Sequence, residues 1–300
     1  MNKIALLFPG QGAQYPGMGK PLYETEREIF DMAEKFRPGI TKICFEGTPD
    51  DLKKTENTQP CLYLAELAAA NSLLRAGIKP DVLAGFSLGE IVALAVGGAY
   101  SYDVCFEIVC RRGELMAKCS EKFETGMFAV LKLSNEEVER ICSLHSDVYP
   151  VNYNCPGQVT VAGLKTALDA AKADFTAAGA KVIPLAVSGG FHSPFMDEAA
   201  EKFREFLAGR DVGLIEIPVW ANCNAEPYGD DVWSLMETQI NHPVRFEQII
   251  RNMADTGVDT FIEVGPGQTL SKFVKKILPD ATTLHAETPE EIAAVKEVLA

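Results

Sequence analysis

Hydrophobic residues follow two different rhythms along the chain. Toward both ends, short apolar runs of strand length alternate with longer segments in which apolar residues recur at helical spacing. The clearest short runs are KIALLF (3–8), DVLAGF (81–86), IPVWAN (217–222) and TFIEVG (260–265). Such alternation is typical of a parallel sheet covered by helices on both faces. These parts of the sequence therefore predict an α/β domain.

One helical segment, QPCLYLAELAAANSLLRAG, lies between the first two strands. Pro60 stands near its start and Gly77 just after its last apolar residues. Proline favours the first turn of a helix and glycine the position after its end. We expect a helix that begins close to Pro60 and ends before Gly77.

The middle of the chain has another order of elements. Its segments are GMFAVLKL, SNEEVERICSLH, DVYPVNYN, QVTVAG, KTALDAAKADFTAAG and AKVIPLAV, which predict strand, helix, strand, strand, helix and strand. This βαββαβ order is that of a ferredoxin-like domain. We therefore expect residues 124–190 to be inserted into a discontinuous core of residues 1–123 and 191–300. The predicted fold class is α/β, with a parallel-sheet, α/β-hydrolase-like large domain and a ferredoxin-like small domain.

The amino-acid composition limits the classes of partner that the protein can bind. The chain has 300 residues, of which 47% are hydrophobic and 23% charged, and this excludes a disordered chain. Its 28 Lys and Arg against 42 Asp and Glu give a net charge of -14, which is unfavourable for binding nucleic-acid phosphates. No stretch approaches the ~20 apolar residues that span a bilayer. We expect neither nucleic acid nor a membrane as partner.

The cysteines indicate the compartment. Eight are present, and none forms a CxxC pair or stands at ligand spacing from a histidine. In a chain of this length they are interpreted as free thiols in a reducing cytoplasm, whereas a disulfide scaffold favours small secreted domains. No metal site is expected.

GFSLG at 85–89 is the sharpest local motif. It follows an apolar strand and precedes the helical segment EIVALAV. Serine on such a tight turn projects its hydroxyl out of the sheet, while the flanking glycines leave room for the turn. Ser87 is therefore a candidate nucleophile, and the backbone N–H of Leu88 is a candidate donor to an oxyanion. An ordinary serine in a strand-to-helix turn is the alternative.

The best candidate for a base is His192. It lies in the glycine loop VSGGFHSP, where a side chain can reach a cleft between two domains. His145 and His285 lie in polar segments, and His242 precedes Pro243, which suggests a turn. A surface position is the alternative for His192.

PGQGAQ at 9–14 follows the first strand. It fails as a dinucleotide fingerprint because Tyr15 replaces a required glycine, and as a phosphate loop because Pro21 follows Lys20. A nucleotide cradle is therefore not predicted. Gln11, at the carboxyl end of a strand, is instead a candidate donor to an oxyanion.

Arg112 falls inside the apolar stripe of the helical segment 101–120, whereas Arg111 lies about 100° away. A buried guanidinium needs a carboxylate partner, because an unpaired buried charge costs several kcal/mol. Two interpretations stay open. One is an internal salt bridge, for instance to Glu90, and the other is a bidentate clamp for a substrate carboxylate.

Taken together, the motifs identify a family. Eight segments occur in a compatible order and spacing: FPGQGAQYPGMG, TENTQP, GFSLGE, RRGELM, NYNCPGQVTVAG, FHSPFM, NHPVRF and EVGPGQTL. With these, the chain resembles, almost end to end, the malonyl-CoA:acyl carrier protein transacylase family of fatty acid synthesis. The resemblance implies that Ser87 accepts the acyl group, that His192 is its base, and that Arg112 holds the malonyl carboxylate. Gln11 and the Leu88 N–H would form the oxyanion hole.

The resemblance implies three further roles. The main-chain carbonyl of Gln239 would orient the histidine, Asn154 would line the pocket, and Phe191 would crowd a methyl branch on the substrate. The sequence departs from the family pattern at two positions, with His242 where Asn or Ser is more frequent and Phe86 where His is usual.

The implied reaction is ping-pong transfer of malonyl from malonyl-CoA to the phosphopantetheine thiol of acyl carrier protein, with no permanently bound cofactor. Two basic clusters are candidates for docking this acidic carrier: Lys272, Lys275 and Lys276, or Lys165, Lys172 and Lys181. The alternatives are a malonyl acyltransferase serving a polyketide synthase, a serine hydrolase of the α/β-hydrolase type, and a non-catalytic carrier-binding module.

Overall fold

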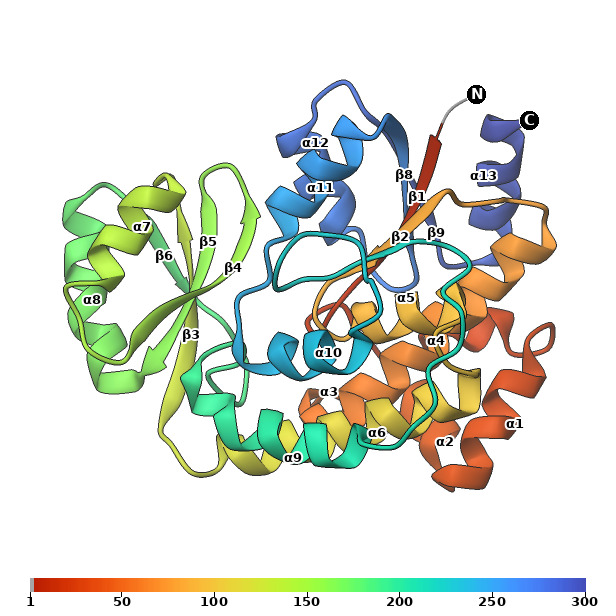
Figure 1. The fold of residues 1–300 in the computed structure, drawn as a ribbon, viewed down its shortest axis with the longest axis horizontal. Coiled ribbons are helices and arrows are strands. Elements are labelled where there is room, and N and C mark those ends of the chain that lie inside the picture. Colours follow the sequence, from red (N-terminus) through yellow and green to blue (C-terminus); the bar gives the residue numbers. More distant parts are fainter. Residues whose placement is uncertain (1–2) are drawn as a thin grey trace.

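The computed structural model describes residues 3–300, which form a large and a small part lying side by side (Figure 1). The centre of the large part is a parallel sheet with the strand order β7-β2-β1-β8-β9. Its strands are β1 (Lys3–Phe8), β2 (Val82–Gly85), β7 (Val219–Trp220), β8 (Val258–Val264) and β9 (Thr282–Ala286). The carboxyl ends of β1 and β2 meet at one edge, because Phe8 pairs with Gly85.

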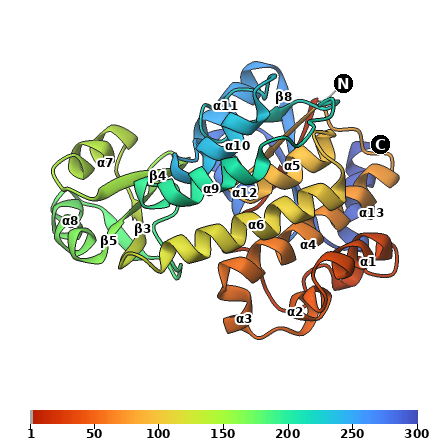
Figure 2. The ribbon, with the colours of Figure 1, turned by 60° about the horizontal axis from the view of Figure 1, so that its bottom comes forward.

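Helices cover both faces of this sheet. The helices of the large part are α1 (Arg27–Phe36), α2 (Ile40–Glu46), α3 (Pro49–Lys53), α4 (Thr55–Arg75), α5 (Gly89–Gly97), α6 (Tyr102–Ser120), α9 (Asp197–Leu207), α10 (Val232–Asn241), α11 (Phe246–Asp255), α12 (Thr269–Ile277) and α13 (Pro289–Leu299). Those in direct contact with the strands of the sheet are α4, α5, α11, α12 and α13. Side chains of β1 alternate between two cores: Leu6 and Phe8 pack with α4, α5 and α6, whereas Ala5 and Leu7 pack with α11 and α12. Burial on both faces explains why residues 4–8 of the first strand are all apolar. Figure 2 shows α6 running beside α4 from the small part across the large one.

The small part contains an antiparallel sheet with the strand order β4-β5-β3-β6. Its elements are β3 (Thr125–Leu131), α7 (Asn135–Cys142), β4 (Val148–Cys155), β5 (Gln158–Leu164), α8 (Lys165–Ala177) and β6 (Lys181–Pro184). Residues such as Phe128 and Val130 pack against α7 and α8, while Met127 and Ala162 belong to the main core of the large part. A separate antiparallel sheet is thus present, and the domain boundaries at 124 and 190 stay a prediction.

A backbone seam joins the two parts. The N–H of Tyr153 in β4 donates to the carbonyl of Val244 at 2.9 Å, and the N–H of Val244 donates to the carbonyl of Val151 at 2.8 Å. Strand β4 therefore continues its hydrogen bonding onto the segment that follows α10.

Helix α4 differs from the sequence prediction at its start. It begins at Thr55, so Pro60 lies inside the helix rather than near its first residue. Pro60 has no N–H to bond the carbonyl of Glu56, and Arg37 Nη1 donates to that carbonyl instead. A side chain from outside the helix thus satisfies the group that the proline leaves free. The end of α4 agrees with the prediction, since Gly77 follows it with φ 93°.

Two further differences from the sequence prediction concern the strands. Strand β9 was not predicted, and β7 is only Val219–Trp220 within the predicted segment 217–222. All eight cysteines lie within residues 3–300 and are free thiols. Among the helices of the described residues, none is both long enough and apolar enough to cross a membrane.

Candidate active site

Ser87 lies on a sharp turn between β2 and α5. Its backbone is in the left-handed region, with φ 54°. The glycines beside it are required by close packing: a Cβ on Gly85 would lie 1.8 Å from the carbonyl carbon of Gly89, and one on Gly89 would lie 2.1 Å from the Phe8 oxygen. Only glycine fits at these two positions. The turn therefore brings Ser87 out above the carboxyl ends of β1 and β2.

The structure brings Ser87 and His192 together. Ser87 Oγ lies 2.7 Å from His192 Nε2, and His192 Nδ1 lies 2.8 Å from the main-chain oxygen of Gln239. A carbonyl can only accept, so Nδ1 carries the proton and Nε2 is free to accept the proton of the serine hydroxyl. Burial and the nearby charge of Arg112 lower the pKa of His192 to about 3. The imidazole is thus neutral at physiological pH, with Nε2 unprotonated.

The other three histidines lie elsewhere. His145 Nε2 contacts Asp174 at 2.7 Å, and His242 directly follows α10, with its Nδ1 3.0 Å from the Thr238 carbonyl. Among residues 3–300, the ligand atoms of His285, Glu287 and Glu291 come within 4.8 Å of one another. These atoms already contact protein groups: His285 faces Glu291, Tyr15 donates to Glu287, and Glu291 caps α13.

Arg112 is fully buried in α6 and reaches the serine. Its Nη2 donates to Ser87 Oγ at 3.2 Å and to Gln239 Oε1 at 2.7 Å, and its Nη1 donates to Gln59 Oε1 at 2.8 Å. Burial lowers the pKa of Arg112 to about 10, so it stays charged at neutral pH. Its protein partners are all uncharged.

A salt bridge from Arg112 to Glu90 was the sequence alternative, and it is not present. None of the ion pairs formed within residues 3–300 includes Arg112. Glu90 instead accepts the hydroxyl of Tyr228 and the N–H of Asn222. Burial raises the pKa of Glu90 to about 7. The guanidinium therefore has a counter-charge nearby but no carboxylate in contact.

Two backbone donors lie beside the serine. Within the described residues, neither the N–H of Gln11 nor that of Leu88 donates a hydrogen bond to another protein group. Both residues line a cavity of about 80 Å³ that also includes Ser87, Phe191 and His192. The side-chain amide of Gln11 lies 3.5 Å from Thr55 Oγ1. Free N–H groups in such a position can stabilise negative charge on an oxygen bonded at Ser87.

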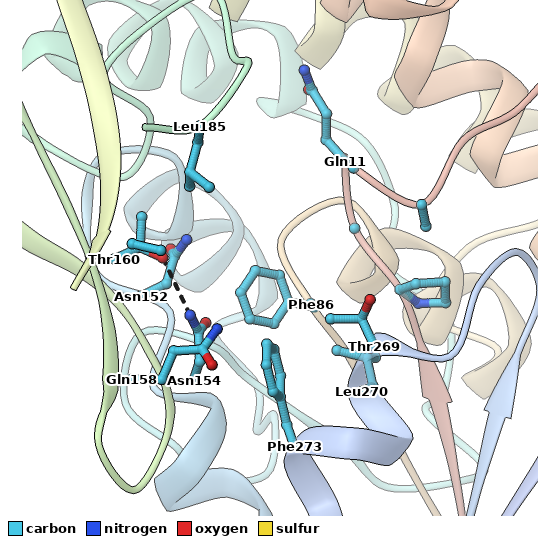
Figure 3. Close-up of a pocket in the computed structure, with 15 residues that line it drawn as sticks. Gln11, Phe86, Asn152, Asn154, Gln158, Thr160, Leu185, Thr269, Leu270 and Phe273 are labelled. Carbon is cyan, nitrogen blue, oxygen red and sulfur yellow. Dashed lines mark hydrogen bonds between the residues drawn. The ribbon is translucent and has the colours of Figure 1, made fainter. Parts of the chain in front are cut away.

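A larger cavity of about 280 Å³ continues outward from this space (Figure 3). The smaller cavity beside Ser87 is called the inner cavity and the larger one the outer cavity. They share Gln11, Phe86, Asn152 and Leu185. Figure 3 shows the polar wall of the larger one, formed by side chains from β4 and β5: Asn152, Asn154, Gln158 and Thr160. The opposite wall includes the aromatic rings of Phe86 and Phe273. The cavity can therefore hold an elongated group with both amide and apolar portions.

The sequence-predicted pocket residues lie at different depths. Phe191 is in the inner cavity next to His192, whereas Asn154 lines the outer one and donates to Thr160 Oγ1 at 3.2 Å. Phe86, which departs from the family pattern, packs on Phe246 with ring centroids 5.7 Å apart.

Sequence reasoning missed two residues of this site. Gln59 stands in the TENTQP motif and Asn222 at the end of IPVWAN, but neither type of residue signals chemistry by itself. Gln59 holds Arg112, and Asn222 Oδ1 accepts the N–H of Ser87 at 2.7 Å. Their motifs were visible, whereas their contacts depend on the fold.

Comparison with known proteins identifies the class. Residues 5–293 match the family described as acyl transferase domain. The malonyl CoA-acyl carrier protein transacylase of Bacillus subtilis (strain 168) is 38% identical over 310 residues, covering 100% of this chain and 98% of the relative. The chain therefore belongs to the acyl transferase family.

Solved structures narrow the grouping. A malonyl CoA-acyl carrier protein transacylase from Clostridium perfringens has a TM-score of 0.95 and 35% identity, covering 99% of this chain and 97% of that one. A malonyl-transacylase solved in complex with its type II PKS acyl-carrier protein has a TM-score of 0.95 and 30% identity, with 99% of each chain covered. Within the family, this chain groups with the malonyl CoA-acyl carrier protein transacylases.

Proposed function

We propose that this protein transfers the malonyl group from malonyl-CoA to the phosphopantetheine thiol of acyl carrier protein, through an ester on Ser87. One observation carries the proposal. The hydroxyl of Ser87 lies 2.7 Å from His192 Nε2 and 3.2 Å from Arg112 Nη2. A nucleophile, a base and a cation suited to a carboxylate thus meet at one atom.

In the first half-reaction, Ser87 Oγ attacks the thioester carbonyl while its proton passes to His192 Nε2. The N–H groups of Gln11 and Leu88 stabilise the tetrahedral oxyanion, each by roughly 3 kcal/mol in comparable sites. The carbon–sulfur bond then breaks, and His192 returns the proton to the departing thiolate of coenzyme A. The carbonyl of Gln239 stabilises the imidazolium formed between these two proton transfers.

Arg112 supplies the selectivity. Its guanidinium is buried, charged and held only by uncharged partners, so the free carboxylate of a malonyl group is the counter-ion that completes its environment. An acetyl group lacks that carboxylate and leaves the charge unpaired, so it is disfavoured. Phe191 beside His192 limits the room for a branch on the acyl chain.

In the second half-reaction, the phosphopantetheine thiol gives its proton to His192 and attacks the ester carbonyl. The ester bond breaks, Ser87 regains a proton from His192, and malonyl leaves on the carrier. The amide and apolar walls of the outer cavity match the amides and methylenes of the arm. We propose no permanently bound cofactor.

Of the two basic clusters, Lys272, Lys275 and Lys276 have the better position for the carrier. They line an open depression of about 580 Å³ that shares Gln158, Thr269 and Phe273 with the outer cavity. A carrier held there by its acidic surface can extend its arm toward Ser87. The relative solved with its acyl-carrier protein supports a partner of this class.

The rival functions have less support. A serine hydrolase of the α/β-hydrolase type normally orients its histidine with an acid, whereas here a main-chain carbonyl contacts His192 Nδ1. A non-catalytic module would not need a histidine and a buried arginine placed against the hydroxyl of Ser87. Service to a polyketide synthase stays an alternative pathway for the same chemistry, since one similar structure contains a type II PKS carrier.

The finer description of the architecture is also a proposal. The antiparallel sheet order β4-β5-β3-β6 and the βαββαβ succession support a ferredoxin-like small domain, residues 124–190. The Ser87 turn after a parallel strand supports an α/β-hydrolase-like core of residues 1–123 and 191–300. We propose the cytoplasm as the compartment, because the eight cysteines are free thiols.

Intact-mass measurement after brief exposure to malonyl-CoA tests the function. The expected result is one malonyl adduct that transfers to acyl carrier protein and is absent from Ser87→Ala. Rapid release of malonate without a thiol acceptor would support the hydrolase instead. Carrier binding with no adduct would support the non-catalytic module.

A further inference from the structure

The conformation of Ser87 needs support from its surroundings. A non-glycine residue at φ 54° is strained and persists only where neighbouring groups hold it. Asn222 contacts the two peptide groups on either side of Phe86, directly before the strained N–Cα bond of Ser87. Its Oδ1 accepts the N–H of Ser87 at 2.7 Å, and its Nδ2 donates to the carbonyl of Gly85 at 2.6 Å. One side chain therefore holds the chain that enters the turn, while Gln239 Nε2 donates to the Ser87 carbonyl after it at 2.6 Å.

The position of Asn222 follows from the end of strand β7. That strand pairs with β2 only as far as Trp220, opposite Ala84. Beyond that point, the amide of Asn222 replaces the missing strand as hydrogen-bond partner for the end of β2. Asn222 is fully buried, so water is no substitute for these contacts.

The main chain of Asn222 is itself held on both sides. Its N–H donates to Glu90 Oε2 at 2.7 Å, and its carbonyl accepts the N–H of Arg245 at 2.9 Å. Glu90 stands in the first turn of α5, directly after the serine turn. The strand, the turn and the helix are thus tied to one residue.

A carboxamide is the side chain that fits these two contacts. It offers an acceptor to the Ser87 N–H and a donor to the Gly85 carbonyl from the same planar group. An ionised aspartate has no donor, and leucine has neither group. Either replacement leaves a buried backbone group without a partner.

We propose that Asn222 is the positioning residue of the nucleophile, and that its amide holds the Ser87 turn in the conformation from which Oγ reaches His192. This role rests on the proposed function of Ser87. It concerns the rate of serine acylation and not substrate binding, because Asn222 lies outside the residues that line the two cavities.

The test compares Asn222→Leu and Asn222→Asp with the unaltered protein. Malonyl-enzyme formation is followed by rapid quench and intact mass, and KM for malonyl-CoA is measured alongside. We expect Asn222→Leu to slow acylation by roughly 10- to 100-fold, as for a small misplacement of a reacting group. KM should stay within about twofold, because none of the hydrogen bonds of Arg112 is made to Asn222.

Asn222→Asp gives a second readout that depends on pH. Protonated aspartic acid can accept from Ser87 N–H and donate to the Gly85 carbonyl, whereas the ionised form cannot donate. Its rate relative to the unaltered protein should therefore be highest at low pH and fall as the introduced acid ionises. The deficit of Asn222→Leu should not depend on pH. If Asn222→Leu does not fold, this profile carries the test alone.

Tyr228→Phe is the matched control. It removes the hydrogen bond to Glu90 in the same buried network without touching the serine turn. We expect it to lower the melting temperature and leave acylation unchanged. Equal slowing by Tyr228→Phe, an unchanged acylation rate in folded Asn222→Leu, or an Asp variant that improves at high pH would each overturn the proposal. If the proposed function itself fails, the unaltered protein forms no adduct.

Discussion

Arg112 donates a hydrogen bond to the nucleophile candidate: its Nη2 lies 3.2 Å from Ser87 Oγ. The cation that would recognise one end of a malonyl group therefore stands within contact of the atom that would attack the other end. Binding and chemistry are close in space but involve different side chains, so single substitutions can separate them.

Replacing Arg112 by alanine should remove the recognition of the carboxylate. We expect malonyl transfer to fall by about 100-fold or more, because loss of a buried charge partner typically costs 2–5 kcal/mol. Transfer of uncharged acyl groups such as acetyl should be retained or gain slightly. Competition between malonyl-CoA and acetyl-CoA, read by the mass of the acyl-enzyme, measures the change. An undiminished malonyl preference would show that Arg112 is a structural cation.

Gln59→Glu should weaken malonyl binding through charge alone. The new carboxylate would stand where Gln59 Oε1 now accepts from Arg112 at 2.8 Å, and would compete with the substrate for the guanidinium. We expect KM for malonyl-CoA to rise roughly 10-fold or more, with little change in acylation by an uncharged activated ester. Gln59→Met is the control, since it removes the hydrogen bond without adding a charge and should have the smaller effect on KM.

Activity should not decline as pH falls through the usual histidine range. The pKa of His192 is lowered to about 3 by burial and by Arg112, so the imidazole, the proposed base, stays unprotonated well below pH 6.5. The acid limb of kcat/KM for acylation is therefore expected below pH 5. A limb near 6.5 would mean that the imidazole is solvated in the working enzyme.

The same shift affects stability. Because the folded pKa of His192 lies below its unfolded value, the unfolded chain binds more protons between about pH 3 and 6.5. This residue therefore lowers stability as pH falls through that window. His192→Ala should show a weaker loss of melting temperature on acidification than the unaltered protein does.

Gly85→Ala should destabilise the fold severely. Its Cβ would lie 1.8 Å from the Gly89 carbonyl carbon, so the turn would have to move. We expect a loss of roughly 3 kcal/mol or more in the free energy of unfolding, together with loss of acylation. Gly126→Ala is the control, because its Cβ would meet nothing closer than 3.6 Å, and chemical denaturation should show a change below about 1 kcal/mol.

Phe86→His tests the departure from the family pattern. The ring of Phe86 packs on Phe246 at 5.7 Å, and losing an aromatic pair costs about 1 kcal/mol. We expect a modest drop in melting temperature and a rate within severalfold of the original, because no hydrogen bond to Ser87 depends on this side chain. A large rise in rate would mean that phenylalanine impairs the natural site.

Much of the fold was readable from local patterns. Strand-length apolar runs gave β1, β2 and β8, because a buried parallel strand is apolar on both faces. The start of α4 could not be predicted from such patterns. Pro60 is tolerated inside the helix because Arg37, which is distant in sequence, donates to the carbonyl of Glu56 that the proline leaves free. Strand β9 was missed because TTLHA carries little apolar signal and is held by pairing with β8.

The residues of the candidate site likewise include some that the sequence alone identified and some that it did not. Ser87 and His192 are reactive residue types in glycine-rich turns, so the sequence alone singled them out. Gln59 and Asn222 are amides whose importance lies in what they touch, and those contacts join residues 53 and 135 positions apart. Spacing along the chain carries no information about such contacts.

The seam between the two parts has a consequence for protein engineering. Strand β4 is attached through main-chain hydrogen bonds of Val151 and Tyr153 to Val244, and such bonds require no particular side chain, only residues other than proline at positions 153 and 244. A chimera that exchanges the small part between homologous enzymes would therefore keep this junction without redesign. His192 and Gln239 both lie in the large part, so the exchange would leave the contact between His192 Nδ1 and the Gln239 carbonyl in place.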